Sequence, residues 1–215
     1  MRMQAPRTEP FVTALVLAAG ASRRLGRAKQ LLPYGERTLL GHVLRTARAC
    51  RFDQIVVVLG GAESEVRAGV DLAGADVVVN DAHASGCSSS IAAALEAVDQ
   101  RCEVLVLMLG DQPGVDADTV AMLCAARGEA QIAACRYENG RGHPIAFARG
   151  AFGQLAALHG DKGVWRLLEQ CGEDVVEVPI AGRVPLDVDT AEDYQAVLAQ
   201  AGLGASRHAT VSALG

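Results

Sequence analysis

The sequence predicts an α/β fold with a mostly parallel sheet, and two observations carry this prediction. Short, wholly apolar runs, typical of strands buried on both faces of such a sheet, occur at residues 15–19, 55–59, 77–79 and 104–109. Segments with apolar residues at helical spacing separate these runs, which favours right-handed strand–helix–strand connections. With 215 residues, we expect a single Rossmann-like three-layer α/β/α domain over residues 11–200, with flexible tails at 1–10 and 202–215.

Composition narrows the class of protein. Hydrophobic residues make up 50% of the chain and aromatic residues only 4%, so the core should be aliphatic. A net charge of −5 argues against nucleic acid or an acidic membrane as a partner. No apolar run approaches the roughly 20 residues of a membrane span, and the first ten residues lack a signal-peptide centre, which predicts a cytoplasmic protein. The six cysteines show no Cys-x-x-Cys spacing, so we expect free thiols.

The first apolar run leads into a basic loop that contains glycines. Gly20 and Gly26 permit unusual backbone conformations, and the N–H groups between them can point at one anion. Positive charge around this loop comes from Arg23, Arg24, Arg27 and Lys29. Such charge in an acidic chain favours a polyphosphate ligand, although an ordinary turn is the alternative. The sequence lacks both the P-loop ending Gly-Lys-Ser/Thr and the dinucleotide fingerprint Gly-x-Gly-x-x-Gly.

Aspartates follow two later segments. The run at 104–109 ends in Gly-Asp-Gln-Pro, and a parallel strand would bring Asp111 to the edge of the sheet where the basic loop lies. A carboxylate there repels a bare triphosphate, but it becomes favourable once Mg²⁺ lies between them. Asp187 and Asp189 are two residues apart, so an extended backbone would direct both to one side. Thr190 can cap the following helix, which gives Asp189 an alternative role at a helix start.

Other polar positions allow both a functional and a structural interpretation. Asn80 ends the run at 77–79, and residues 85–90 open a helix whose N-terminus and serines offer hydrogen-bond donors. His143 lies in a segment that reads as a hairpin turn feeding a strand, where it can be purely structural. Lys162 lies in a charged turn and Cys87 near the helix start. Lys162 could meet a phosphate or could simply be a solvated turn residue. Cys87 could have a chemical role or could simply fill a position that needs a small side chain.

The motifs together resemble one family. The string Leu-Ala-Ala-Gly-Ala-Ser-Arg-Arg-Leu-Gly at residues 17–26, followed by Lys29, Leu32 and Pro33, resembles the signature of the MobA-like NTP transferases. That family includes molybdopterin guanylyl- and cytidylyltransferases. Gly-Asp-x-Pro at 110–113 resembles the family's metal-binding motif, and the resemblance extends from about Val12 to about Leu198. It implies a fold like that of the nucleotide-diphospho-sugar transferases.

The resemblance also implies roles for individual residues. Lys29, Arg23 and Asp111 would be catalytic, and Asp111 and Asp189 would hold Mg²⁺ or Mn²⁺. The implied nucleotide contacts are Leu17, Ala18, Ala19, Gly20, Ala21, Ser22, Arg24, Gly26, Asn80, Gly86, Ser88 and Ser89. The implied acceptor contacts are Gly142, His143 and Pro144.

One position bears on the substrate. The guanylyl branch tends to carry a second glycine where this chain has Ala19, so the chain is more similar to the cytidylyl branch. This similarity implies CTP and molybdenum-bound molybdopterin as substrates, with an apo xanthine-dehydrogenase-type molybdoenzyme as a partner. Alternatives are a different phosphorylated acceptor (molybdopterin with GTP, or a sugar phosphate), a non-catalytic chaperone for the finished cofactor, and, more distantly, a nicotinamide-dependent oxidoreductase.

Overall fold

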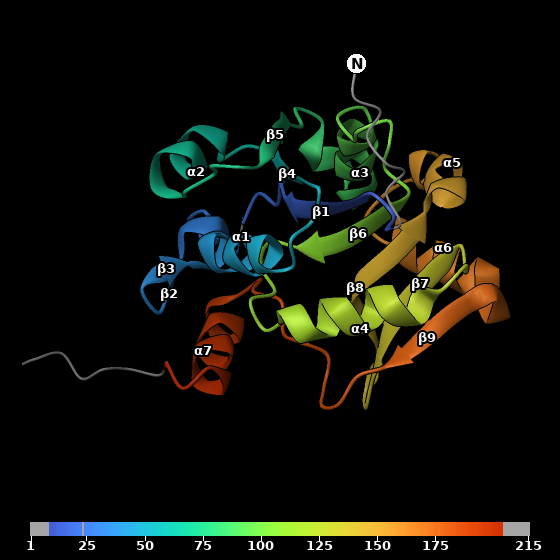
Figure 1. Ribbon diagram of the computed structural model, residues 1–215. Coiled ribbons are helices and arrows are strands. Elements are labelled where there is room, and N and C mark those ends of the chain that lie inside the picture. Colours follow the sequence, from blue (N-terminus) through green and yellow to red (C-terminus); the bar gives the residue numbers. More distant parts are fainter. Residues whose placement is uncertain (1–8, 23, 204–215) are drawn as a thin grey trace, which may run out of the picture.

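The computed structural model describes residues 9–22 and 24–203. A seven-stranded sheet runs in the order β5-β4-β1-β6-β8-β7-β9 (Figure 1). Its strands are β1 (Val12–Ala18), β4 (Gln54–Leu59), β5 (Asp76–Val79), β6 (Val104–Leu109), β7 (Ile132–Tyr137), β8 (Gly140–Ala148) and β9 (Val175–Pro179). Only the pairs made by β8 are antiparallel. The prediction of a mostly parallel α/β sheet is therefore confirmed. Arg23 and most of the two expected tails lie outside the described residues.

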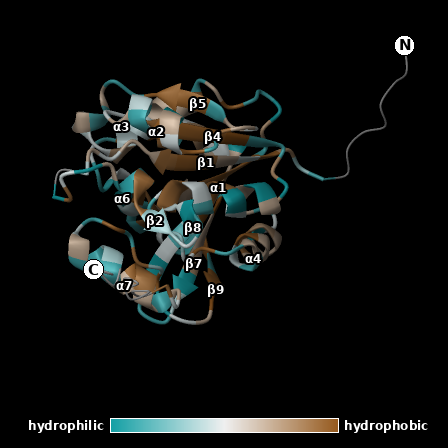
Figure 2. Ribbon diagram, turned by 90° about the vertical axis from the view of Figure 1, so that its left-hand side faces the viewer, coloured by the Kyte–Doolittle hydropathy of each residue, from teal (hydrophilic) through white to brown (hydrophobic). Residues whose placement is uncertain are grey.

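Helices cover both faces of this sheet (Figure 1). One face packs on α1 (Leu39–Ala49), α2 (Glu63–Gly69) and α4 (Ala117–Arg127), and the other on α3 (Cys87–Leu95), α5 (Phe152–Ala156) and α6 (Gly163–Cys171). Side chains of β1 alternate between the two faces. Ala14 and Val16 belong to the hydrophobic core under α1, α2 and α4, while Leu15 and Leu17 belong to the core under α3, α5 and α6. Hydrophobic colour accordingly follows β1, β4 and β5 in Figure 2. In the described part of the chain, no helix is long and apolar enough to cross a membrane.

A third, smaller core lies beside the sheet. It joins α7 (Ala191–Gln200) to a hairpin of β2 (Pro33–Tyr34) and β3 (Arg37–Thr38), and its buried members are Leu32, Tyr34, Leu39, Val188, Tyr194 and Val197. The Tyr194 hydroxyl donates to the Pro33 carbonyl at 2.6 Å. Lys29 shortly precedes the hairpin and Asp189 lies two residues before α7, so this core fixes the chain beside both residues.

The start of α7 confirms the cap predicted at Thr190. Its hydroxyl accepts from the Asp193 backbone N–H at 3.1 Å, while the Asp193 carboxylate accepts from the Thr190 N–H at 2.8 Å. This reciprocal arrangement satisfies donors that the first turn of a helix leaves open. Because Asp193 does this work, the side chain of Asp189 is left for other contacts.

Candidate active site

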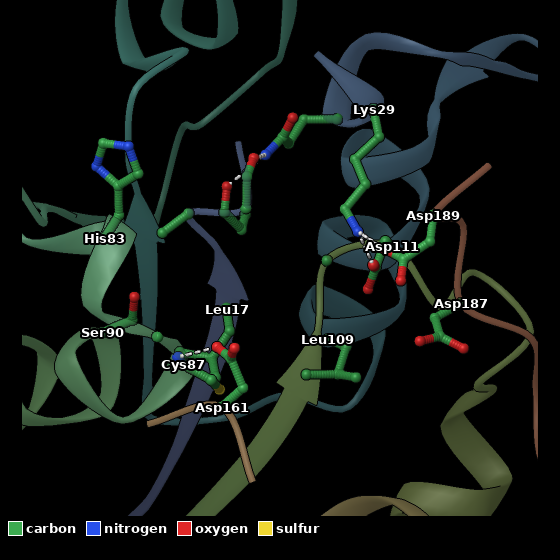
Figure 3. A pocket seen from close by; sticks show the side chains of 16 residues that line it. Leu17, Lys29, His83, Cys87, Ser90, Leu109, Asp111, Asp161, Asp187 and Asp189 are labelled. Atoms are coloured by element: carbon green, nitrogen blue, oxygen red, sulfur yellow. Dashed lines mark hydrogen bonds and ion pairs between the residues drawn. The ribbon is translucent and has the colours of Figure 1, made fainter. Parts of the chain in front are cut away.

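A cavity of about 340 Å³ opens at the edge where β1 and β6 end. The backbone at residues 17–20 forms one wall, and the start of α3 forms part of another. The carboxyl ends of parallel strands are the usual ligand site of open α/β sheets. Charged side chains gather at one end of this cavity, around Lys29, Asp111, Asp187 and Asp189 (Figure 3).

Lys29 lies between two carboxylates. Its Nζ is 2.5 Å from Asp111 Oδ2 and 2.8 Å from Asp189 Oδ1 (Figure 3). Arg24 Nη2 donates to the other oxygen of Asp189 at 2.8 Å. The structure thus brings together four of the residues singled out in the sequence, from a 3₁₀ turn (Lys29–Leu31), the end of β6, the start of α7 and the basic loop.

The electrostatics of this cluster follow from burial and pairing. Burial alone would lower the pKa of Lys29, but ion pairs with Asp111 and Asp189 outweigh it and raise the pKa. Lys29 hydrogen bonding keeps the pKa of Asp189 below its ordinary value, with Arg24 assisting. Burial raises the pKa of Asp111. The Lys29 ammonium lowers that pKa in part, and the nearby Asp187 charge raises it further. We therefore take Lys29 as charged, and infer that one ammonium only partly offsets the cost of ionising Asp111.

The same carboxylates fit a divalent cation. Asp111 and Asp189 contact one nitrogen, so both carboxylates face the same point of the cavity, which the Lys29 ammonium occupies. Carboxylate oxygen is a preferred ligand of Mg²⁺, which usually takes one or two carboxylates and completes its shell with water and substrate phosphate. No group of three His, Cys, Asp or Glu suited to a metal occurs among the described residues, so substrate phosphate and water would have to supply the other ligands.

Two side chains hold the basic loop. Ser22 Oγ accepts from the Lys29 backbone N–H at 2.9 Å. Gln30 Nε2 donates to the carbonyls of Ala18 and Gly20, at 2.6 and 3.1 Å. Sequence reasoning missed Gln30, because nothing in the local pattern distinguishes a buried glutamine from a solvated one.

Some of the implied nucleotide contacts in this loop line the cavity and others do not. Residues 17–20 line the cavity. Ala21 and Gly26 are exposed and do not line it, whereas Arg23 is outside the described residues. Their assignment as ligand contacts remains a prediction.

Most of the hydrogen-bond donors expected at the start of α3 are already bonded to other protein groups. Asn80 Nδ2 donates to Ser89 Oγ and Ser90 Oγ, both at 2.9 Å. The Ser88 hydroxyl donates to the Gly160 carbonyl at 2.6 Å, and the Ser89 hydroxyl to the Gly86 carbonyl at 2.8 Å. Gly86 and Ser90 line the cavity, whereas Asn80, Ser88 and Ser89 support it from behind. The roles of Asn80, Gly86, Ser88 and Ser89 toward a nucleotide remain predictions.

A turn far along the chain docks on the same helix start. Asp161 Oδ1 accepts from the Cys87 backbone N–H at 3.0 Å, and Gly86 has a φ of 110°. A Cβ on Gly86 would lie 2.8 Å from the backbone carbon of Gly160, so this close approach requires glycine. Sequence reasoning missed Asp161, because a contact across 74 residues leaves no local signal. Lys162, directly after it, is exposed and does not line the cavity.

Cys87 lines the cavity as a protonated thiol. Burial raises its pKa to about 11, and the charges of Asp161 and Asp111 add to this effect. A thiol with so high a pKa is a poor nucleophile near neutral pH. The structure thus favours the structural interpretation of Cys87.

His143 is buried away from the cavity. Its ring packs edge-on against Trp165 at a centroid distance of 5.3 Å, and burial lowers its pKa to about 4. A Cβ on Gly142 would lie 2.9 Å from the Tyr137 ring. Pro144 is likewise buried, and none of these three residues lines the cavity. Their proposed contact with an acceptor remains a prediction, beside a packing role that the structure shows.

Fold and site together define a class of protein. A mostly parallel seven-stranded sheet of this order is shared with solved nucleotidyltransferases. A nucleotidyl transferase from Methanothermobacter thermautotroptrophicus has this fold, with a TM-score of 0.75 at 21% identity over 89% of this chain and 98% of that one. The chain belongs to the MobA-like NTP transferase family, whose domain matches residues 14–175.

Two relatives are similar over most of their length. Nicotine blue oxidoreductase of Paenarthrobacter nicotinovorans is 35% identical over 75% of this chain and 83% of its own. Purine catabolism protein PucB of Bacillus subtilis is 30% identical over 87% of this chain and 96% of its own. One name refers to an oxidoreductase and the other to purine catabolism, so the two names together do not define the reaction of this chain.

Solved structures agree with the fold in detail. A homologue of Mycobacterium tuberculosis Rv0371c from Mycobacterium sp. strain JC1 is 55% identical, with a TM-score of 0.83 over 88% of this chain and 96% of that one. Rv0371c of M. tuberculosis H37Rv in complex with manganese is 46% identical, with a TM-score of 0.79 over 87% of this chain and 98% of that one.

Proposed function

We propose that this protein transfers CMP from CTP to the terminal phosphate of a molybdenum-bound molybdopterin and releases pyrophosphate. The observation that carries this proposal is Lys29 between Asp111 and Asp189 at the ligand edge of the sheet. A protein that only carried a finished cofactor would not need this arrangement of one cation and two potential metal ligands. Membership of an NTP transferase family supports the same chemistry.

The reaction needs little from the protein in the way of proton transfer. An oxygen of the acceptor phosphate attacks the α-phosphorus of the nucleotide, and a new P–O bond forms. The bond from the α-phosphorus to the bridging oxygen breaks, and pyrophosphate leaves with the electron pair. Because the attacking phosphate is already ionised near neutral pH, no general base is required. The high pKa of Cys87, about 11, also argues against a thiolate nucleophile in this cavity.

Positioning and charge are the tasks left to the side chains. Lys29 would neutralise the α-phosphate, and Arg23 or Arg24 would hold the β- and γ-phosphates. Asp111 and Asp189 would hold Mg²⁺ or Mn²⁺, which supplies Lewis-acid stabilisation of phosphate oxygens when bound. The manganese complex of Rv0371c supports a divalent metal in this branch of the family.

The choice of substrates is supported less directly. Ala19 replaces the glycine typical of guanylyl enzymes, which supports CTP. The name of PucB refers to purine catabolism, and xanthine dehydrogenases oxidise purines. An acceptor destined for such a molybdoenzyme, with the apo-dehydrogenase as recipient, agrees with that name.

The test is pyrophosphate release with Mg²⁺ and each of CTP, GTP, ATP and UTP, with and without molybdopterin cofactor. We expect release with CTP only when the cofactor is present. Lys29→Ala and Asp111→Ala should each lower turnover by about 10²–10³-fold or more. Lys162→Ala, which changes an exposed lysine that does not line the cavity, is the matched control. Binding of the cofactor without any pyrophosphate release would instead indicate a chaperone.

A second candidate rests on one comparison. The similarity to nicotine blue oxidoreductase raises an oxidoreductase activity for the same cavity. The sequence lacks the dinucleotide fingerprint, which argues against binding of a nicotinamide cofactor in the usual way. Oxidation of NADH or NADPH by the protein in the presence of a quinonoid dye, followed by absorbance, would favour this candidate over nucleotidyl transfer.

A further inference from the structure

The Lys29 ammonium lies at the point that both aspartates face (Figure 3). Its Nζ is 2.5 Å from Asp111 Oδ2 and 2.8 Å from Asp189 Oδ1, and only 13% of the Lys29 side chain is exposed. A divalent cation that took an oxygen from each carboxylate would need this same position. Like charges repel strongly where water is scarce, so the ammonium and the divalent cation cannot share it. The ion pairs that the structure shows and the metal site that the proposed function needs therefore exclude each other.

The second cation at Asp189 does not compete for this position. Arg24 Nη2 pairs with Oδ2, the other oxygen of Asp189, at 2.8 Å. The Arg24 side chain is 67% exposed, so water and salt screen its charge. Among the residues that the structure describes, only Lys29 forms ion pairs with both Asp111 and Asp189.

The Lys29 side chain can move while its backbone stays fixed. The Lys29 backbone N–H donates to Ser22 Oγ at 2.9 Å, and the Lys29 carbonyl accepts from the Leu32 N–H at 3.1 Å. Beyond this anchored backbone, lysine carries its ammonium on a flexible four-carbon chain. A Cβ on Gly20 would lie 3.4 Å from Lys29 Cε and 3.9 Å from Nζ, so the chain passes the bare backbone of Gly20, which lines the same cavity. A rotation of this chain would therefore carry the ammonium from the carboxylates to a phosphate beside Gly20.

We propose that Lys29 is an exchangeable counter-ion, which pairs with both aspartates in the free protein and moves to a substrate phosphate when a divalent cation takes its position. The inference rests on the proposed function, which assigns Lys29 to the α-phosphate and the two aspartates to the metal. Both assignments hold only if Lys29 leaves the aspartates. The free protein should then bind metal weakly, because apparent affinity falls with the fraction of molecules in which the position is free. Nucleotide, by drawing Lys29 away, strengthens metal binding, and metal strengthens nucleotide binding by the same factor.

Mn²⁺ binding without nucleotide, followed by electron paramagnetic resonance at about pH 8 where carboxylates are ionised, tests this exchange. We expect Lys29→Met to bind Mn²⁺ about tenfold or more tightly than the wild type, because the position is then free. Arg24→Met is the matched control, since it removes one positive charge from Asp189 but leaves Lys29 in place. It should change Mn²⁺ affinity by about threefold or less. Mn²⁺ should also raise the melting temperature of Lys29→Met more than that of the wild type, which tests the same point in a less stable variant.

The exchange can also be followed in the wild-type protein. The chain has two lysines, Lys29 and Lys162, so labelling with ε-¹³C-lysine gives two NMR signals, which the variant Lys162→Met assigns. Titration with Mg²⁺ should shift the Lys29 signal, because the ammonium loses its carboxylate partners. The Lys162 signal should stay in place, because this lysine is exposed and does not line the cavity.

The outcomes separate this inference from the proposed function. Equal or weaker Mn²⁺ binding by Lys29→Met would overturn the exchange, and so would Mg²⁺ binding that leaves the Lys29 signal unchanged. Pyrophosphate release together with unchanged Mn²⁺ affinity in Lys29→Met would refute the exchange alone. Tighter Mn²⁺ binding by this variant, with no pyrophosphate release by the wild type from any nucleotide, would refute nucleotidyl transfer and support the exchange.

Discussion

Removal of the Lys29 ammonium tests whether the observed ion pairs exist in solution. The Lys29 and Asp111 side chains keep only 13% and 15% of their exposure, so Lys29→Met leaves a mostly buried carboxylate without its partner. Loss of one partner from a fully buried pair costs about 3–5 kcal/mol, and the residual exposure lowers our expectation to about 2–3 kcal/mol. For a chain of this length that corresponds to a fall in melting temperature of about 5–10 °C.

Combining Lys29→Met with Asp111→Asn should restore part of this stability, because the second change removes the buried charge. The measurement is urea unfolding of the wild type, both single variants and the double variant, in the presence of a metal chelator. The dependence of the unfolding free energy on urea must have the same slope in all four proteins for their stabilities to be compared. A coupling energy of about 1.5–2 kcal/mol is expected from the cycle, while all three variants stay inactive. Lys162→Met, at an exposed position, should change stability by less than about 0.5 kcal/mol. A coupling energy near zero would show that the pair contributes nothing in solution, and would refute the reasoning.

Four other substitutions, one of them a control, have expected outcomes. His143 is neutral when folded, with a pKa of about 4, but protonates near 6.5 when unfolded, so stability should fall as pH drops through this window, by up to about 3 kcal/mol at pH 4. His143→Gln should flatten that dependence in urea titrations from pH 7 to 4; an unchanged slope would count against burial as the cause. Gly86→Ala should cost about 3 kcal/mol by thermal unfolding, because its φ of 110° and its contact with Gly160 exclude a Cβ. Gly153→Ala, within α5 and with no atom in the way, should be neutral or slightly stabilising, and equal losses in the two variants would contradict the steric argument. Arg24→Ala breaks an exposed pair and should cost less than about 1 kcal/mol, yet raise the KM for the triphosphate more at low salt than at high salt; a salt-independent KM would argue against a phosphate contact.

The parts of the site that could be predicted follow strands with unambiguous patterns. The apolar runs that form β1 and β6 are typical of strands buried on both faces of a parallel sheet. The carboxyl ends of neighbouring parallel strands lie at the same edge of the sheet. The sequence alone therefore predicts that Asp111 and the basic loop bearing Lys29 share one edge of the sheet. The position of Asp189 could not be predicted in the same way, because it depends on a core shared by α7 and the β2–β3 hairpin. The sequence indicated only a turn and a capped helix at these two places.

Features that depend on tertiary contacts could not be predicted. The antiparallel pairing of β7 with β8 confirms the hairpin predicted around His143. The pairing of β8 with β6 has no signature in its apolar residues, because Ile145 and Phe147 are buried in the same way beside either neighbour. His143 belongs to a motif with the composition of an exposed turn, yet Trp165 covers it from another element. Asp161 reads as part of a solvated turn, and only the docking of that turn on α3 brings it to the cavity.

The bond between Lys29 and Asp189 spans 160 positions of the chain. On a ribosome that adds about 5–20 residues per second, the basic loop would emerge on the order of ten seconds before its aspartate partner is made. During that interval a nascent chain can form β1, β4 and β6 but cannot complete the cluster. The charge cluster can therefore form only after nearly all of the described chain has been made.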